Sequence, residues 1–390
     1  MIRNLLVFDS HPVQYRVPIW QGMELLYPGC IHVAYASDCS VRGYEDKEFG
    51  QRLAWDEPLL DGYSFSILNC ENGVPLSGWK SLTGAGVKEE IKRLSPSAIL
   101  LTGLNYRFDF VVYLEAKRRR IPIWLRSESQ DHAFNRSKLK SLLRSCFYKI
   151  AYAGIKKFFY IGELNRLHYL SHGVQPCKLA EAHYCTVDRF KTLDATLKTQ
   201  LRIHARKNAE IESSRLVVGF SGKFIPKKNP WILYKMLWHL PRKLLERLTL
   251  YFIGSGELEE ELKELGEDAY KKFGVDSFFA GFIKQIKLPE HYLAMDILVL
   301  PSQKMGETWG LVANEALQAG CGVVVSSAVG CSADFKNLDR FAVFEENNEI
   351  ELAECVLKLS EFERDFNWAT EKLNNYSIES VAVALSNALQ

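Results

Sequence analysis

The chain has 390 residues, of which 47% are hydrophobic and 25% charged, and its formal net charge at pH 7 is +2. A single hydrophobic core rarely serves a chain of this length, so these values predict a globular protein of two domains. The positive and negative charges are nearly balanced, which argues against nucleic acid as the main partner.

The cysteines and the apolar runs indicate the compartment. Nine cysteines are scattered along the chain without a C-x-x-C pair, which argues against a disulfide framework or a structural zinc site. The first apolar run is too short for a signal peptide, and nowhere do about 18 apolar residues follow one another as in a membrane span. We therefore expect a cytoplasmic protein.

The first half alternates short apolar runs with amphipathic stretches. The predicted buried strands are residues 4–8, 31–37, 64–68, 97–103 and 121–127. Helical spacing follows over 87–94 and 110–120, and one long basic helix is predicted from about 136 to 172. Strands that alternate with helices predict a parallel sheet covered on both faces.

The second half repeats this pattern after a polar stretch. Its predicted strands are residues 215–222, 248–254, 277–282, 296–302 and 321–327. We expect an N-terminal domain over 1–190, a connector over 191–214, a C-terminal domain over 215–370, and a last helix over 371–390 that packs back toward the first domain. Two such parallel sheets place ligands at the carboxyl ends of their strands, facing the cleft between the domains.

The segment PSQKMGETWGLVANEALQAG (301–320) holds the strongest candidate site. A buried strand ends, a loop follows, and a helix begins near Gly310 and Leu311. The start of a helix offers unpaired amides and a positive dipole end, which suit a diphosphate. Glu307 in the loop and Glu315 in the helix could each accept two hydrogen bonds from a vicinal diol. The alternative is that both are ordinary acids, one solvated in the loop and one favoured by the helix dipole.

A second candidate is FSGKFIPKKNP (220–230). A strand ends at Gly222, and Lys223 and Lys228 lie five residues apart across a proline-containing turn. Two ammonium groups here could neutralise a diphosphate and stabilise it as a leaving group. Lys227 could take the role of its neighbour, and solvated lysines are the alternative reading of the segment.

These segments lead to a family resemblance. Four motifs follow in order, namely GKFIPKK (222–228), FIGSGE (252–257), LPEHYLAMDILVLPS (288–302) and ETWGLVANEA (307–316). In order, spacing and the E-x7-E pair, residues 215–330 resemble glycosyltransferase family 4, whose fold is GT-B, with two Rossmann-like domains. Lys223 stands where that family usually has arginine, which keeps the charge and loses bidentate geometry.

The resemblance implies a role for each motif. It implies that the diphosphate is bound by Gly222, Lys223 and Lys228, and that backbone amides are supplied by Gly310, Leu311 and Val312. It further implies that Glu315 holds the ribose, that Glu307 touches the transferred sugar, and that Ile283 lies against the base. It also implies a retaining, metal-independent transferase that uses a UDP- or GDP-linked sugar as co-substrate and has no tightly bound cofactor. The chain has no D-x-D pair at a strand end to hold a divalent ion.

The first domain is expected to hold the acceptor. The run HPVQY (11–15) resembles a subset of family 4 with an H-P-x-Q-Y segment, which implies that His11, Gln14 and Tyr15 meet the acceptor or the donor phosphates. His11 joins Glu307, Lys223 and Lys228 as a catalytic candidate. LRSESQDH (125–132) supplies Arg126, Glu128 and His132, and the choice between Glu128 and His132 stays open. A glycan or lipid-linked glycan of surface polysaccharide synthesis is the expected acceptor.

Two further segments have competing interpretations. Residues 136–157 are basic with interleaved apolar residues, so they either contact an anionic membrane peripherally or bury an apolar stripe with their lysines in water. His168 and His172 have i, i+4 spacing, but without a third ligand they are predicted to lie on a helix surface rather than to bind metal.

Two other functions use the same residues. A glycoside hydrolase would use Glu307 and Glu315 as acid and nucleophile, and the two lysines argue against it. A non-catalytic GT-B scaffold would bind nucleotide sugar without turnover, and the presence of both glutamates and both lysines argues against that.

Overall fold

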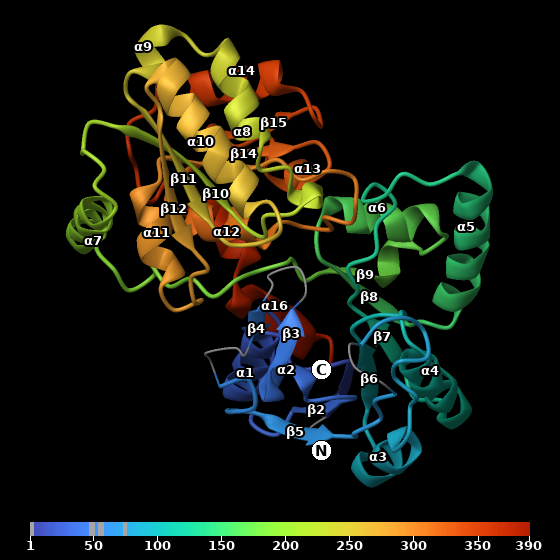
Figure 1. Ribbon diagram of the computed structural model, residues 1–390. Coiled ribbons are helices and arrows are strands. Elements are labelled where there is room, and N and C mark those ends of the chain that lie inside the picture. The colour runs from blue at the N-terminus through green and yellow to red at the C-terminus, as the bar shows by residue number, and fades with distance from the viewer. Residues whose placement is uncertain (1–3, 47–50, 54–57, 73–75) are drawn as a thin grey trace.

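A computed structural model describes residues 4–46, 51–53, 58–72 and 76–390. These residues form two α/β domains, each built on one parallel sheet (Figure 1). The prediction of two Rossmann-like domains with parallel sheets is confirmed. A short antiparallel pair, β3 (Tyr44–Asp46) with β4 (Gln51–Leu53), lies outside both sheets.

The first sheet has the order β5-β2-β1-β6-β7-β8-β9 among the described residues. Its strands are β1 (Leu5–Asp9), β2 (Ile31–Tyr35), β5 (Ser64–Ile67), β6 (Ala98–Leu101), β7 (Ile123–Leu125), β8 (Lys157–Tyr160) and β9 (Leu179–Glu181). β1 and β6 are buried at every position, as expected for central parallel strands covered on both faces. The strand order reverses between β1 and β6, which makes this pair the switch point of the sheet.

Helices cover both faces of the first sheet. The helices of this part are α1 (Val17–Leu26), α2 (Cys39–Arg42), α3 (Val87–Leu94), α4 (Arg107–Arg119), α5 (Lys138–Ala153) and α6 (Glu163–Ser171). Buried residues of α1 pack on one face, and those of α3, α4, α5 and α6 pack on the other. The last helix of the chain, α16 (Ile378–Asn387), packs against α1 and shares its core.

The second sheet has the order β12-β11-β10-β13-β14-β15, also counted over the described residues. Its strands are β10 (Leu216–Ser221), β11 (Leu248–Ile253), β12 (Asp276–Gly281), β13 (Ile297–Leu300), β14 (Gly322–Ser326) and β15 (Phe341–Phe344). The order reverses between β10 and β13, and that pair is the second switch point.

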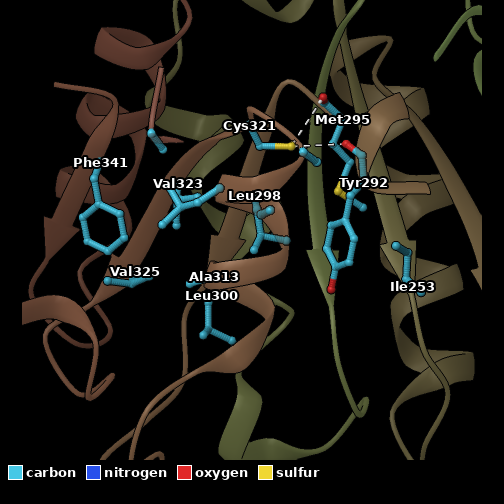
Figure 2. Packing of buried hydrophobic residues seen from close by; sticks show 14 of the residues in the cluster. Ile253, Tyr292, Met295, Leu298, Leu300, Ala313, Cys321, Val323, Val325 and Phe341 are labelled. Atoms are coloured by element: carbon cyan, nitrogen blue, oxygen red, sulfur yellow. Dashed lines mark hydrogen bonds between the residues drawn. The ribbon is translucent and has the colours of Figure 1, made fainter. Parts of the chain in front are cut away.

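The second sheet is also covered on both faces. Its helices are α7 (Ala195–Asn208), α8 (Ile232–Lys235), α9 (Arg242–Leu245), α10 (Glu259–Phe273), α11 (Leu288–Ala294), α12 (Leu311–Gln318), α13 (Ser332–Phe335), α14 (Glu349–Leu359) and α15 (Thr370–Leu373). One core joins the sheet to α7, α11 and α12, and the other joins it to α8, α9, α10 and α14. Figure 2 shows the first of these cores, where side chains of β13, β14 and α12 meet.

Several elements differ from the sequence prediction. The long helix predicted over 136–172 is wrong, because β8 divides it into α5 and α6. The run KFFY of β8 is too short for its periodicity to distinguish a strand from a helix. β9 and β15 were not predicted. Residues 191–214, expected to be a connector, contain α7, which begins where Asp194 accepts a hydrogen bond from the amide of Leu197 at 2.8 Å.

Among the helices of the described residues, none combines the length and the apolar character that a bilayer crossing needs.

A close backbone approach joins the loops after β10 and β11. Gly254 has φ +138°, and a Cβ placed on it would lie 1.9 Å from the carbonyl oxygen of Gly222. Both the conformation and the contact require glycine at this position. The two glycines therefore shape the edge of the sheet at which β10 ends.

We expect Gly254→Ala to lower the free energy of unfolding by roughly 2–5 kcal/mol, because it adds a steric overlap to an unfavourable backbone conformation. Gly274→Ala is the matched control, since Gly274 has φ +68° and a Cβ there would meet nothing within 4 Å. That control should cost only about 1 kcal/mol. Chemical denaturation of both variants measures the difference, and equal costs would contradict the steric argument.

Candidate functional site

The candidate site lies at the switch point of the second sheet. The loops after β10 and β13 leave the carboxyl edge of the sheet side by side, and α12 begins at the end of the second loop. Below this edge, Leu298 and Leu300 of β13 and Ala313 of α12 belong to one buried core (Figure 2). The rigid core fixes where the polar residues above it can lie.

Glu307 and Lys228 form a partly buried ion pair between these loops. The Lys228 ammonium donates to the Glu307 carboxylate, and the side chains are 18% and 12% exposed. Ser302 at the end of β13 also donates to this carboxylate, at 3.0 Å. Burial raises the pKa of Glu307, but the charge and hydrogen bond of Lys228 outweigh burial and hold that pKa below its ordinary value. Glu307 is therefore an ionised acceptor at neutral pH.

Glu315 has a different set of partners. Tyr292 of α11 donates to one oxygen at 2.7 Å, and Gln285 donates to the other at 2.9 Å. Tyr292 is also 3.0 Å from the hydroxyl of Ser221 at the end of β10. Burial raises the pKa of Glu315, and the hydrogen bonds from Tyr292 and Gln285 oppose this only in part. These bonds fix the carboxyl group and leave acceptor positions for a further ligand.

The start of α12 lies between the two glutamates in the chain. Gly310 precedes the helix with φ +98°, and a Cβ on it would meet Leu300 at 2.6 Å. Leu311 and Val312 form the first turn, and among the described residues no side chain caps it. The helix start therefore presents backbone amides and the positive end of its dipole at the edge where Lys228 lies.

The two adjacent lysines have separate contacts. Lys227 donates to the carbonyl oxygen of Gly306 at 3.3 Å, whereas Lys228 reaches Glu307. Lys223 follows Gly222 at the end of β10, where its carbonyl accepts from the amide of Ile225. Ile283 follows β12 and is partly buried against the core of the second domain.

A cavity of about 460 Å³ faces this site from the first domain. His11 after β1 and Thr102 after β6 line it, so it opens at the switch point of the first sheet. Thr308 of the second domain lines it as well. Burial, and next the charge of Arg16, lower the pKa of His11 to about 4, so His11 is neutral at pH 7.

Among the other first-domain candidates, Glu128 lies in the cavity, whereas Arg126 and His132 contact backbone carbonyl groups. Glu128 lines the cavity, where its carboxylate accepts from Tyr184 and, at 3.3 Å, from the Thr308 hydroxyl. Arg126 is buried, and it donates at 3.1 Å to two carbonyl groups of residues 182–183. The His132 ring lies 2.7 Å from the carbonyl oxygen of Ser327.

The last two candidates lie in the turn before α1. Tyr15 packs against Tyr184 with ring centroids 5.4 Å apart, and burial raises the pKa of Tyr15 to about 12. Gln14 is half-buried in the same turn. Tyr15 therefore shapes the wall between the domains as a neutral aromatic group.

Several residues that hold the site are not among the predicted ones. Gln130 is buried and donates at 2.9 Å to the carbonyl oxygen of Thr308, beside Glu307. Tyr292, Gln285 and Ser302 orient the two glutamates. Only the position of Ser302 at the end of a predicted strand could have indicated its role. The others lie far from the glutamates in sequence, and no local pattern marks them.

His168 of α6 and His172, the residue that follows this helix, do not lie on a helix surface, so that prediction is wrong. His168 is 2% exposed and His172 6%. Together with Asp131 they place possible ligand atoms within 4.8 Å of one another. Both ring nitrogens of His168 are used, at 2.9 Å each, by Asp131 and by the Tyr152 hydroxyl. The Arg144 guanidinium pairs with the other oxygen of Asp131, so these groups already have protein partners.

The chain is similar to known proteins in part of its sequence and in its fold. Residues 202–377, slightly less than half of the chain, match the family described as glycosyl transferases group 1. The chain is 30% identical over 139 residues to "Uncharacterized glycosyltransferase MJ1607" of Methanocaldococcus jannaschii, which is 35% of this chain and 34% of that protein. It is 29% identical over 143 residues to "Lipopolysaccharide 1,2-N-acetylglucosaminetransferase" of Salmonella typhimurium, which is 35% of this chain and 37% of that protein. The matched region thus spans about a third of each relative's length.

The whole chain shares its fold with a solved structure, Anabaena Alr3699/HepE in complex with UDP. The two align over 99% of both chains with a TM-score of 0.71 and 15% sequence identity. The fold is therefore GT-B. Within that class the second domain carries the glycosyl transferases group 1 sequence, which supports the glycosyltransferase family at this broad level. Family 4 and its H-P-x-Q-Y subset stay predictions.

We expect Lys228→Met to lower the free energy of unfolding by roughly 1–3 kcal/mol, because it leaves the partly buried Glu307 carboxylate without its cation. Lys228→Met/Glu307→Gln should recover most of this loss. Lys227→Met is the matched control, because the Lys227 ammonium donates to a carbonyl group and acts on Glu307 less strongly than Lys228 does. Urea denaturation measures all three variants, and equal losses for the two lysines would contradict the ion-pair assignment.

The same pair predicts a pH dependence of stability. Because the pKa of Glu307 is lower in the folded protein than in the unfolded chain, its contribution is present above its ordinary pKa and is lost as the pH falls through its folded value. The difference in free energy of unfolding between wild type and Glu307→Gln should therefore shrink in acid. Denaturation between neutral pH and about pH 3 tests this, and a difference that grows in acid would refute it.

Proposed function

We propose that the protein transfers a sugar, with retention of configuration, from a UDP- or GDP-linked donor to a hydroxyl group of an acceptor. The observation that carries this proposal is the convergence of three features at the switch point of the second sheet. These are the Glu307–Lys228 pair, the hydrogen-bonded Glu315 and the uncapped start of α12. Such a combination of ammonium, carboxylate and helix start suits a diphosphate with a diol on each side of it.

In the proposed complex the diphosphate lies over the start of α12. The amides of Gly310, Leu311 and Val312 donate to it, and Lys223 and Lys228 add positive charge beside Gly222. Glu315 accepts from the ribose hydroxyls, and Ile283 lies against the base. UDP in the Anabaena structure and the group 1 match of residues 202–377 support a nucleotide-sugar donor.

The proposed chemical step is a front-face substitution. The bond from the anomeric carbon to the diphosphate oxygen breaks, and the acceptor oxygen bonds to that carbon on the same face. The acceptor proton passes to a diphosphate oxygen. Lys223, Lys228 and the helix dipole stabilise the charge that develops on the diphosphate, so a divalent ion is not needed in this proposal. The ionised Glu307 accepts from hydroxyls of the transferred sugar and favours positive charge at its anomeric carbon.

The acceptor is proposed to enter the cavity of the first domain. Neutral His11 can accept a hydrogen bond from its hydroxyl, and Glu128 can accept another on the opposite wall. Gln14, Tyr15, Arg126 and His132 shape this wall or hold it in place. A glycan or lipid-linked glycan is the proposed acceptor, in surface polysaccharide synthesis on the cytoplasmic side of a membrane. The name of the Salmonella typhimurium relative, a lipopolysaccharide transferase, supports this class.

We expect one nucleoside diphosphate to raise the melting temperature of wild type, because a ligand that binds only the folded state stabilises it, by about 2.7 kcal/mol at a hundredfold excess over Kd. Glu315→Gln should reduce or abolish the shift. The matched control is Glu260→Gln, which alters an 84% exposed glutamate in the first turn of α10. A thermal-shift screen of UDP, GDP, ADP and CMP measures it. No shift with any nucleotide would refute the proposal.

Turnover separates the transferase from its alternatives. With the donor that the screen identifies, wild type should form a product of unchanged anomeric configuration, and Glu307→Gln should lower kcat by at least about a hundredfold. Nuclear magnetic resonance of the new linkage reports the configuration. An inverted product would refute the front-face step. Binding without turnover would favour a scaffold, and cleavage of a simple glycoside without nucleotide would favour a hydrolase.

A further inference from the structure

Helix α5 exposes a continuous apolar stripe. Leu139, Leu142, Leu143 and Ile150 are 66%, 61%, 62% and 76% exposed. At about 100° per residue they fall within one face of the helix. Of the whole of α5, only two residues near its C-terminal end are buried. Figure 1 shows α5 at the outer edge of the first domain.

The charged residues of α5 and of the segments that flank it are all positive. Residues 136–157 contain no aspartate or glutamate. Their seven basic residues are Arg136, Lys138, Lys140, Arg144, Lys149, Lys156 and Lys157. By helical position, Lys138 and Lys149 border the stripe on one side and Lys140 borders it on the other. Lysines beside an apolar stripe can lay their methylene groups along an apolar layer while their ammonium groups stay in water.

The opposite face of α5 attaches it to the domain. Arg144 binds Asp131, and the Tyr148 ring lies edge-on to His168 at 4.8 Å between centroids. Arg144 and Tyr148 also line the cavity that contains His11. One helix therefore separates that cavity from the exposed stripe, and the outer diameter of an α-helix is about 10–12 Å.

We propose that α5 docks on an anionic lipid bilayer, with Leu139, Leu142, Leu143 and Ile150 inserted at the headgroup level and its lysines beside the lipid phosphates. A purely apolar partner would need no basic border, whereas an anionic bilayer requires both the stripe and the charges. α5 has 16 residues and lies along the surface of the domain, so it lies in the interface rather than crossing it.

The docked orientation defines the acceptor class. The cavity lies about one helix diameter from the bilayer surface, so an acceptor whose sugar or phosphate head occupies it can keep an apolar anchor in the membrane. The acceptor is therefore a lipid-linked molecule rather than a free glycan. This assignment of the acceptor rests on the proposed function, whereas the docking of α5 does not.

Vesicle flotation of the full chain tests the docking. Wild type should float with vesicles of equal parts phosphatidylcholine and phosphatidylglycerol, and binding should fall about tenfold or more with phosphatidylcholine alone or in high salt. Leu139→Gln/Leu142→Gln/Ile150→Gln and, separately, Lys138→Gln/Lys140→Gln/Lys149→Gln should each lower binding by about tenfold or more. The matched control, Leu25→Gln/Ile203→Gln/Ile350→Gln, removes three exposed aliphatic side chains elsewhere and should bind as wild type does.

Three outcomes would overturn the docking. The first is that wild type does not float with anionic vesicles, and the second is that the α5 variants bind the vesicles as strongly as the control does. The third is that wild type is a dimer and an α5 variant is a monomer, which would make the stripe a contact between two copies of the chain. The nucleotide-induced thermal shift is measured on the same variants and should be unchanged. If nucleotides cause no thermal shift but the protein still floats with vesicles, only the proposed transferase function is refuted. If nucleotides cause the shift but the protein does not float, only the docking is refuted.

Discussion

The reversal of strand order in each sheet is the constraint on which the rest of the structure depends. β10 and β13 are hydrogen-bonded neighbours, but the chain winds away from them in opposite directions, so the loops that follow them part and leave a crevice. One loop carries Lys228 and the other carries Glu307, and this arrangement brings the two charges together in a partly buried pair. At the matching point of the first sheet, the residues after β1 and β6 line the cavity.

The two glutamates show how the pKa of one residue type shifts in opposite directions at one edge of a sheet. Lys228 keeps Glu307 ionised, whereas burial raises the pKa of Glu315 and Tyr292 and Gln285 hold it through hydrogen bonds. Neutral donors stabilise a carboxylate less than an adjacent cation does, so the partners decide the difference. A charged group near the sugar and a firmly oriented group near the ribose are what the proposed donor complex requires.

Residues 127–132 connect the parts of the molecule that we assign to donor, acceptor and membrane. Glu128 and Gln130 contact the loop of Glu307, and both line the cavity. Asp131 binds Arg144 of α5 and His168 of α6. This short segment after β7 therefore touches the second domain on one side and the helix with the exposed stripe on the other. Its polar contacts are expected to hold α5 at a fixed distance from the loop of Glu307.

Sequence alone determined the two parallel-sheet domains and the segments of the candidate donor site, because alternating strands and helices, glycines at strand ends and the E-x7-E spacing are local patterns. It left open whether Lys227 or Lys228 contacts a carboxylate and whether α5 buries its apolar stripe. From the sequence alone, His168 and His172 were placed on a helix surface, and α5 and α6 were predicted as one helix. Only the tertiary structure decided these points, because each depends on groups far apart in the chain: Lys228 with Glu307, Asp131 with His168, and β8 with its neighbours in the sheet. Periodicity identifies the apolar face of a helix, but what covers that face is set by the packing of the whole domain.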